Sequence, residues 1–547
     1  MKIRVRYLSI VMAGVFGVLT AAHPALAVKR PKRVMIVVMD QMQPGYATLY
    51  NMQNVLWLQS HGVNFPKAYT GHMTAETVVS HNVMVSGLFP KHMGWSDEVF
   101  RDVNNLLGYG AGTIVTPGDF SLNQFLTLIQ NAGYFKLGNF LLSKFPGTIV
   151  ANVGEKSYQV ESMAASSSDI AVRMGSRKST PLPPLPGKWR GPAGLNVPTY
   201  ISEPLGGRFY ISSDSAYNAY STNTTQPAWI YPEDGRYAPG NIPGHESGDN
   251  WVADATMAIM EHENWSGLWV TFSAIDKIGH MWGGGAVDTE ANYHWDPTSI
   301  YDQVHMRFAA QNADAQLGKL LAKLQALGQF NETLIVLTAD HGSTWGKNFY
   351  GVNELDASTN HNWYLGYSPT GPENGGGNPN LKPLEDLGNV AFSYNCNAIT
   401  TWLTDFSWDK KVQAAQVVSA LPGVIATYVK KNDHYILMSS SSKMTRAEHS
   451  WWIAHGQELV NTMAFSGAAD VVGLLADSTS YGAYGDQGGA QEDGQRIPMA
   501  IYMPGMRHVT DKSAMRLVDI MPTVLKAMGI LPKARMDGRA YDILLPR

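Results

Sequence analysis

Short hydrophobic runs that end abruptly at acidic or imidazole side chains constrain the fold of this chain more than any other feature. The runs are Val34 to Met39, Leu268 to Phe272 and Leu334 to Leu337. Runs so short and so apolar are typical of strands buried on both faces of a parallel sheet. Between them, Phe308 to Leu327 carries apolar residues at close to helical spacing. The sequence therefore predicts an α/β fold, with a mostly parallel central sheet and helices on both faces.

Polar side chains follow each of these three runs at the point where the strand is expected to end. They are Asp40, then Asp276 with His280, then Asp340 with His341. Because chemistry in open α/β sheets gathers beyond the carboxyl ends of the strands, we expect these side chains to lie together. Carboxylate and imidazole suit Zn²⁺, and carboxylate-rich sites also suit Mg²⁺ or Mn²⁺. Singly, each aspartate could cap a helix and His280 could be a packed histidine, but three consecutive strand ends favour a metal site.

A hydroxyl-rich segment, Thr74 to His81, precedes a short apolar stretch that ends at Gly87. A hydroxyl at the start of a helix lies in positive potential, which helps it to ionise and helps an anionic ester to approach. Spacing alone leaves Thr74, Thr77 and Ser80 as alternative nucleophiles. It also leaves the simpler interpretation that Thr74 or Thr77 only caps the helix.

The first segment has the pattern of a signal peptide. Basic residues (Lys2, Arg4 and Arg6) precede an apolar run from Leu8 to Ala22, and Ala25-Leu26-Ala27 forms an A-x-A cleavage site. The run is short for a membrane span, although an uncleaved anchor is the alternative. We therefore expect residues 1–27 to be removed, leaving an exported protein, periplasmic or secreted, without a membrane span after processing.

Composition and charge exclude several functional classes. Hydrophobic residues make up 44% and charged residues 16%, so the mature chain can bury a large core. Removal of residues 1–27 takes away three positive charges, and the formal net charge goes from −4 to −7. Such a protein has no electrostatic basis for binding duplex nucleic acid. We expect one hydrolase domain over residues 28–547, with insertions at about 160–250 and 343–480 that build a cap or smaller lobe. The oligomeric state is not indicated.

Several motifs resemble one known family. Thr77, ten residues before Gly87 in Ser86-Gly87-Leu88-Phe89-Pro90, is similar to the nucleophile segment of nucleotide pyrophosphatase/phosphodiesterases, which belong to the alkaline phosphatase superfamily. Ile275 to His280 resembles the family's D-x-x-G-H ligand pair, and Thr338 to Gly342 its T-x-D-H-G element. The stretch from Leu517 to Thr523 resembles a closing segment shared with sulfatases. The resemblance runs from about residue 33 to 545 and selects Thr77 among the candidate hydroxyls.

The resemblance implies an alkaline phosphatase-like fold and a metal-dependent hydrolase of small phosphate esters that binds two divalent metal ions, with zinc as the expected metal. One ion would be held by Asp40, Thr77, Asp340 and His341, and the other by Asp276, His280 and a last ligand near Gln487. Thr77 would attack phosphorus in line, giving a covalent phosphothreonine that water then hydrolyses.

The last ligand departs from the family pattern. Relatives carry a histidine before a glycine pair, whereas this chain reads Gly485-Asp486-Gln487-Gly488-Gly489. A glutamine oxygen prefers Mg²⁺, Mn²⁺ or Ca²⁺ to Zn²⁺. Three alternatives follow: an altered second metal site, a substitute ligand such as Asp486, or a metal-binding relative with impaired catalysis.

Substrate preference is also left open by the residues that would contact the phosphoryl group. Diesterases of the family often place an asparagine where this chain has Glu98, with Asn104 and Asn105 nearby. Some phosphomonoesterases carry Lys-x-Arg, where this chain has Lys156 and Tyr158. We expect a phosphodiesterase, with a phosphomonoesterase as the alternative. A sulfatase is disfavoured because Thr77 cannot become formylglycine and the single cysteine, Cys396, lies in no such motif.

Overall fold

The computed structural model describes most of the chain outside its first segment. The described residues are 29–116, 122–163, 167–175, 188–190, 198–201, 210–211, 246–282, 300–344, 348–349, 353–356, 361–364, 380–481 and 486–545. The predicted signal peptide and much of the predicted insertion at 160–250 therefore lie outside the described residues.

The three predicted strands lie side by side at the centre of a nine-stranded sheet. They are β1 (Arg33–Met39), β10 (Trp265–Phe272) and β11 (Thr333–Thr338). Strand β1 pairs in parallel with both of the others. The full order is β22-β2-β21-β11-β1-β10-β5-β6-β7. The remaining strands are β2 (Val63–Asn64), β5 (Ile149–Gly154), β6 (Ile170–Gly175), β7 (Lys188–Arg190), β21 (Met499–Tyr502) and β22 (Val509–Thr510).

Most pairings in this sheet are parallel, as predicted, but β21 runs antiparallel to both β11 and β2, and β7 runs antiparallel to β6. The apolar run from Ile497 to Met503 gives β21, yet its direction could not be read from hydrophobicity alone. The strand-like region from Val63 to Tyr69 contributes only the two residues of β2, because the chain turns at Pro66 and Lys67.

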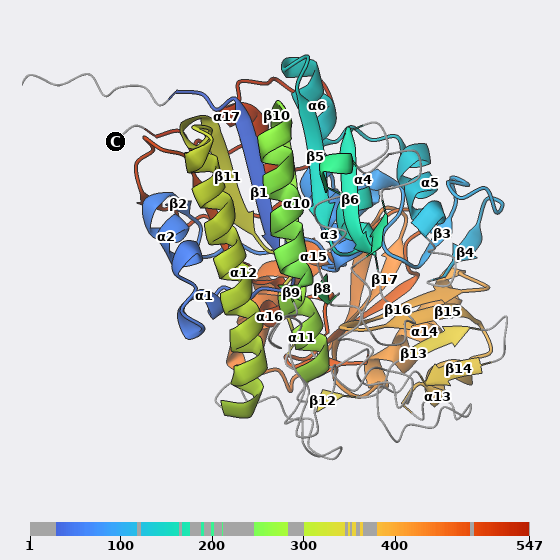
Figure 1. Cartoon of the computed structure of the whole chain (residues 1–547). Helices are drawn as coiled ribbons and strands as arrows, with labels where there is room; N and C mark the ends of the chain where they lie inside the picture. Colours follow the sequence, from blue (N-terminus) through green and yellow to red (C-terminus); the bar gives the residue numbers. More distant parts are fainter. Residues whose placement is uncertain are drawn as a thin grey trace, which may run out of the picture.

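Helices flank the central sheet. Figure 1 shows α10 (Gly248–His262) and α12 (Ile300–Ala326) lying across the near face of the strands. Helix α12 contains the predicted Phe308–Leu327 helix and begins earlier. The other helices are α1 (Tyr46–Leu49), α2 (Gln53–His61), α3 (Thr77–Ser86), α4 (Pro90–Met93), α5 (Leu122–Ala132), α6 (Leu137–Lys144), α7 (Ser157–Glu161), α11 (Ala274–Trp282), α13 (Lys382–Glu385), α14 (Trp408–Ala420), α15 (Arg446–Asn461), α16 (Glu492–Gln495) and α17 (Ile520–Ala527).

A second, seven-stranded antiparallel sheet lies beside the first in the order β14-β13-β15-β16-β19-β17-β18 (Figure 1). Its strands are β13 (Asn353–Asp356), β14 (His361–Tyr364), β15 (Val390–Asn395), β16 (Ala398–Leu403), β17 (Val424–Lys431), β18 (His434–Ser440) and β19 (Val471–Leu475). The described residues also form three two-stranded sheets: β3 (Phe100–Asp102) with β4 (Thr113–Val115), β8 (Tyr210–Ile211) with β9 (Glu246–Ser247), and β12 (Asn348–Phe349) with β20 (Thr479–Ser480).

One hydrophobic core joins the two sheets. It contains the strands around β1 and also Phe392, Trp402 and Tyr428 of the second sheet. A smaller core around Ile399 and Val418 packs α14 onto the second sheet. Among the described residues, no helix is long and apolar enough to cross a membrane.

Candidate active site

The carboxyl ends of the three central strands bring acidic and imidazole side chains into one buried cluster. Asp40 follows β1, Asp276 lies in the first turn of α11 after β10, and His341 follows β11. One ligand atom from each lies within 4.8 Å of the others, and all three side chains are buried. The sequence predicted this convergence because parallel strands end at the same edge of a sheet.

Thr77 is the first residue of α3 and faces this cluster. Its Oγ1 lies 3.5 Å from Asp40 Oδ1 and 3.3 Å from His341 Nε2. Every residue of α3 is buried, and the helix ends at Gly87, whose positive φ of 65° suits a glycine. A hydroxyl at the start of a buried helix meets the unpaired backbone amides of the first turn, which favour negative charge there.

Hydrogen bonds fix the orientation of Asp340 and His341. The Oδ1 atom of Asp340 accepts from the amides of Gln41 (3.1 Å) and His341 (3.0 Å). The Nδ1 atom of His341 lies 2.9 Å from the carbonyl oxygen of Gly342 and can only donate to it. When the ring is neutral, its lone pair is therefore on Nε2, the atom that faces Thr77 and Asp40.

The charges in the cluster shift one another's pKa values. Burial and Asp276 would raise the pKa of Asp40, but Lys156 and His341 outweigh them and lower it to about 2. Burial alone would lower the pKa of His341, but Asp340 and Asp40 raise it to about 9. Burial, with Asp40, raises the pKa of Asp340 to about 8. Strong opposing shifts in one small cluster are typical of functional sites.

The donor set fits a divalent cation. Asp40, Asp276 and Asp340 place three carboxyl groups in a fully buried space, and Asp340 Oδ2 accepts no hydrogen bond within the described part of the chain. Buried carboxylates need a compensating positive charge. Oxygen donors together with one imidazole nitrogen match the ligand types of Zn²⁺ and, less selectively, Mg²⁺ or Mn²⁺. The residues present therefore fit the metal that the sequence predicted.

Lys156 supplies a positive charge at the centre of the cluster. Its Nζ donates to Asp40 Oδ2 at 2.7 Å and to Asp276 Oδ2 at 2.5 Å, and its side chain is only 12% exposed. Burial would lower the pKa of this ammonium group, but Asp276 and Asp40 raise it above its usual value. Tyr158, at the position of the family's arginine, contacts the ring of Phe125 instead, with 5.3 Å between ring centroids.

Two residues at the site were not predicted from the sequence. Gln159, in α7, is fully buried, and its amide donates to Asp40 Oδ2 at 2.6 Å. His81 lies one turn after Thr77, with Nδ1 2.9 Å from the carbonyl oxygen of Thr77 and Nε2 3.1 Å from Thr271 Oγ1. The spacing of four residues from Thr77 was the one available signal for His81. No sequence pattern pointed to Gln159.

Acidic side chains surround the residue that precedes the nucleophile. Burial raises the pKa of Glu76 well above its usual value, and Asp97 and Glu98 add to the effect. Burial and Glu98 likewise raise the pKa of Asp97 to about 8. Asn104 and Asn105, the alternatives considered for this position, are exposed in the segment between β3 and β4. Glu98 and its neighbours therefore belong beside α3.

Comparison with known proteins shows which proteins this chain is similar to. The family model of type I phosphodiesterase/nucleotide pyrophosphatase matches residues 194–455. Alkaline phosphatase PhoK of Sphingomonas sp. is 21% identical over 557 residues, which cover 95% of this chain and 92% of that protein. The crystal structure of wild-type alkaline phosphatase PafA is similar with a TM-score of 0.60 and 14% identity, covering 94% of this chain and 99% of that one. Murine ectonucleotide pyrophosphatase/phosphodiesterase 5 is similar with a TM-score of 0.50 and 10% identity, covering 92% and 97%.

Residues 194–455 match the type I phosphodiesterase/nucleotide pyrophosphatase family, and nearly the whole chain is similar to an alkaline phosphatase of the same superfamily. The chain is a hydrolase that acts on phosphoric ester bonds. The solved structures, at 10–14% identity, share its fold, which confirms the predicted alkaline phosphatase-like α/β architecture.

Two predicted ligands, His280 and Gln487, are not tested by the described part of the structure. The side chain of His280, in α11, lies outside the described residues. Gln487 is half-buried in a loop that is tied to the segment before Thr77, since the amide of Gly488 donates to the carbonyl oxygen of Ala75 at 2.9 Å. Its Oε1 accepts no hydrogen bond from any described residue. Whether Gln487 binds metal stays a prediction.

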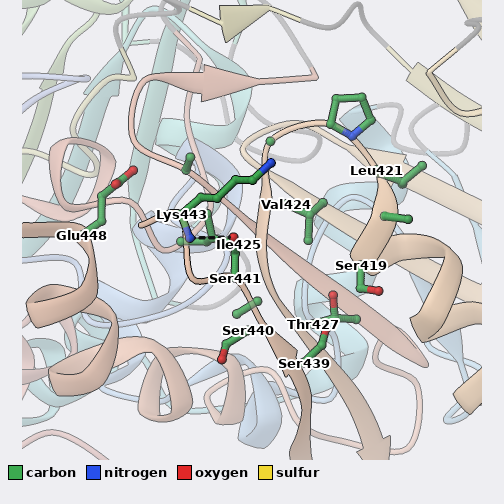
Figure 2. Close-up of a pocket in the computed structure, with 15 residues that line it drawn as sticks. Ser419, Leu421, Val424, Ile425, Thr427, Ser439, Ser440, Ser441, Lys443 and Glu448 are labelled. Carbon is green, nitrogen blue, oxygen red and sulfur yellow. Dashed lines mark hydrogen bonds between the residues drawn. The ribbon is translucent and has the colours of Figure 1, made fainter. Parts of the chain in front are cut away.

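A separate cavity of about 490 Å³ lies in the second sheet, between the end of α14 and strands β17 and β18. Figure 2 shows Lys443, Glu448 and several serine side chains around it. Asp40, Thr77, Asp276, Asp340 and His341 do not line this cavity.

Proposed function

We propose that this phosphoric ester hydrolase is an exported, metal-dependent phosphomonoesterase in which Thr77 is the nucleophile. The observation that carries the choice of a monoester is the ammonium group of Lys156, which lies among the strand-end carboxylates. A monoester dianion carries one more negative charge than a diester, and a buried cation beside the nucleophile would stabilise that charge. The resemblance to the two alkaline phosphatases supports the same choice.

The proposed reaction is a double displacement at phosphorus. Thr77 Oγ1 forms a bond to phosphorus while the bond from phosphorus to the leaving-group oxygen breaks, and the hydroxyl proton is lost to the medium. Water then attacks the phosphothreonine, which restores the hydroxyl and releases phosphate. Asp40, Asp276, Asp340 and His341 would hold divalent ions, which supply Lewis-acid stabilisation of the attacking and leaving oxygens when bound. The start of α3 would stabilise negative charge on the Thr77 oxygen.

A phosphodiesterase is the second candidate, and the acidic group beside α3 favours it. By count from Thr77, Glu98 stands where the family's diesterases often place an asparagine, and an ionised carboxylate there would repel a dianionic monoester more than a monoanionic diester. The two candidates therefore differ in which side chain dominates substrate selection: Lys156 or the acidic group.

The deciding experiment compares hydrolysis of a mono-aryl phosphate with that of the matching bis-aryl phosphate by the purified mature protein after Zn²⁺ loading. A higher kcat/KM for the monoester is expected. A higher kcat/KM for the diester would contradict the phosphomonoesterase and support the phosphodiesterase. Absence of turnover with Zn²⁺, Mg²⁺, Mn²⁺ and Ca²⁺ would instead support the catalytically impaired relative that the Gln487 substitution suggests.

Export is a separate part of the proposal and is supported by residues 1–27. The expected mature N-terminus is Val28, and N-terminal sequencing of the protein recovered from outside the cytoplasm tests it. An intact N-terminus in a cytoplasmic fraction would overturn this part of the proposal without affecting the hydrolase activity.

A further inference from the structure

The side-chain amide of Gln159 ties together three segments that carry site residues. Its Nε2 donates to Asp40 Oδ2 at 2.6 Å, at the end of β1. Its Oε1 accepts from the backbone amide of Lys156 at 3.1 Å, at the end of β5. The hydroxyl of Ser273, at the end of β10, lies 2.8 Å from Nε2 and 3.0 Å from Oε1. One fully buried amide therefore contacts three adjacent strand ends.

Only an amide satisfies these contacts at once. The oxygen faces a backbone donor, and the nitrogen faces a carboxylate, so a carboxylate side chain would repel Asp40 and an apolar side chain would leave buried polar groups unpaired. The site also admits little movement, because a Cβ on Gly154 would come within 3.0 Å of Gln159 Oε1 and 3.2 Å of its Cβ. The amide is held on several sides.

The contact with Asp40 selects which carboxylate oxygen faces the nucleophile. Gln159 and Lys156 both donate to Oδ2. The other oxygen, Oδ1, is the one that lies 3.5 Å from Thr77 Oγ1 and 3.4 Å from His341 Nε2. Rotation of the carboxylate would move Oδ1 away from Thr77 and His341. The two donors that hold Oδ2 therefore also fix the position of Oδ1.

We propose that Gln159 is a positioning residue for the metal site: it fixes the Asp40 carboxylate so that Oδ1 faces Thr77 and His341. This inference rests on the proposed metal-dependent function. Partners of this kind, which orient a metal-binding carboxylate without touching the metal, typically change metal affinity by about 10- to 100-fold when they are removed. Gln159→Met keeps the length of the side chain and removes both polar atoms of the amide, and with them its contacts to Asp40, Lys156 and Ser273.

The test measures Zn²⁺ affinity of the purified mature protein by competition with a chelator, together with the melting temperature of the metal-free protein. Asn152→Leu is the matched control. Asn152 is also a fully buried amide, and it donates to the carbonyl oxygen of Val160, the residue after Gln159, at 2.9 Å. Gln159→Met is expected to weaken Zn²⁺ binding by about 10- to 100-fold, whereas Asn152→Leu lowers the melting temperature and leaves affinity within about threefold of wild type.

Equal losses of affinity in both variants, or wild-type affinity in Gln159→Met, would overturn the proposal. If Gln159→Met does not fold, Ser273→Ala replaces it, because Ser273 orients the Gln159 amide and a loss of Zn²⁺ affinity is again expected. Unchanged affinity in folded Ser273→Ala would then count against the positioning role. A wild-type protein that binds no Zn²⁺, Mg²⁺ or Mn²⁺ would refute the metal-dependent function itself, which is a different outcome.

Discussion

Lys156 Nζ lies 2.7 Å from Asp40 Oδ2, so a buried ammonium group and a strand-end carboxylate meet close to the proposed nucleophile. The lysine enters from the segment after β5, and the aspartate follows β1, two strands away in the sheet order. Under the proposed function, Lys156 is the side chain that neutralises the additional charge of a phosphate monoester, which leads to the first prediction.

Lys156→Ala should lower kcat/KM for the aryl phosphate monoester by about a hundredfold, in the range found when one donor to a developing charge is removed. Hydrolysis of the diester should fall less, because a diester carries one negative charge fewer. Lys144→Ala, at the exposed end of α6, is the control and should leave both values unchanged. Equal losses for the two substrates would show that Lys156 acts on the site as a whole and not on the additional charge.

Thr77→Ala should reduce kcat on the order of a thousandfold or more while the protein remains folded, because the variant lacks the attacking oxygen. Thr77→Ser keeps a hydroxyl at the start of α3 and should retain measurable turnover. Intact-mass measurement after acid quenching should detect a phosphorylated adduct in the wild type and not in Thr77→Ala. Undiminished turnover in the alanine variant would remove Thr77 from the mechanism.

Gln487→His should raise Zn²⁺ occupancy, since imidazole suits zinc better than an amide oxygen does. The Gln487 side chain is half-buried, and the next residue, Gly488, is hydrogen-bonded to Ala75 in the segment that leads to Thr77. Gln413→His, on the exposed face of α14, adds a histidine elsewhere and is the control. Zinc stoichiometry measured by plasma emission should rise only in Gln487→His. A rise in both variants, or in neither, would contradict a ligand position at 487.

The sequence predicted the strand-end ligands because their chemistry depends on a local pattern: a buried strand followed by Asp or His. Asp40, Asp276 and His341 satisfy that pattern, and the sheet brings them together without further information. The helix starting at Thr77 and the glycine that ends it were also predictable, since Gly87 has the positive φ of a helix end.

Gln159 could not be predicted in this way, because its role depends on contacts with residues 114 and 119 positions away in the chain. A glutamine in a short helix has no sequence signature that separates it from a surface residue. The direction of β21 could not be predicted for a related reason. An apolar run indicates that a strand is buried, but not whether the adjacent strands run parallel to it. The features that could not be predicted, the contacts of Gln159 and the direction of β21, therefore depend on tertiary structure.

Gly248→Ala should destabilise the protein and disturb the Lys156 segment. A Cβ on Gly248, the first residue of α10, would collide with the carboxyl group of Glu155, which immediately precedes Lys156. Overpacking of this kind typically costs about 1–3 kcal/mol. Gly45→Ala is the control, since a Cβ there meets nothing within 4 Å. Denaturant unfolding should show a loss in Gly248→Ala alone, and similar stability of the two variants would contradict the close contact with Glu155.

The raised pKa of Glu161 leads to a prediction of how the free energy of unfolding depends on pH. Its carboxyl group is buried in α7, and burial, opposed by the attraction of Arg173, raises its pKa from 4.5 to about 7. A group whose folded pKa exceeds its unfolded pKa binds its proton more tightly in the native state. The resulting stabilisation is fully present below pH 4.5 and is lost as the pH rises to about 7.

Glu161→Gln has no proton to lose at this position, so its free energy of unfolding should not fall across that window as the wild-type value does. Relative to wild type, the variant should gain on the order of 3 kcal/mol between pH 4.5 and pH 8, from the free-energy equivalent of the pKa shift. Urea unfolding at the two pH values measures the difference. Asp409→Asn, exposed on α14, is the control and should follow the wild type at both. A parallel pH dependence in Glu161→Gln and wild type would mean that this carboxyl group ionises in the folded protein without cost, and that the raised pKa is wrong.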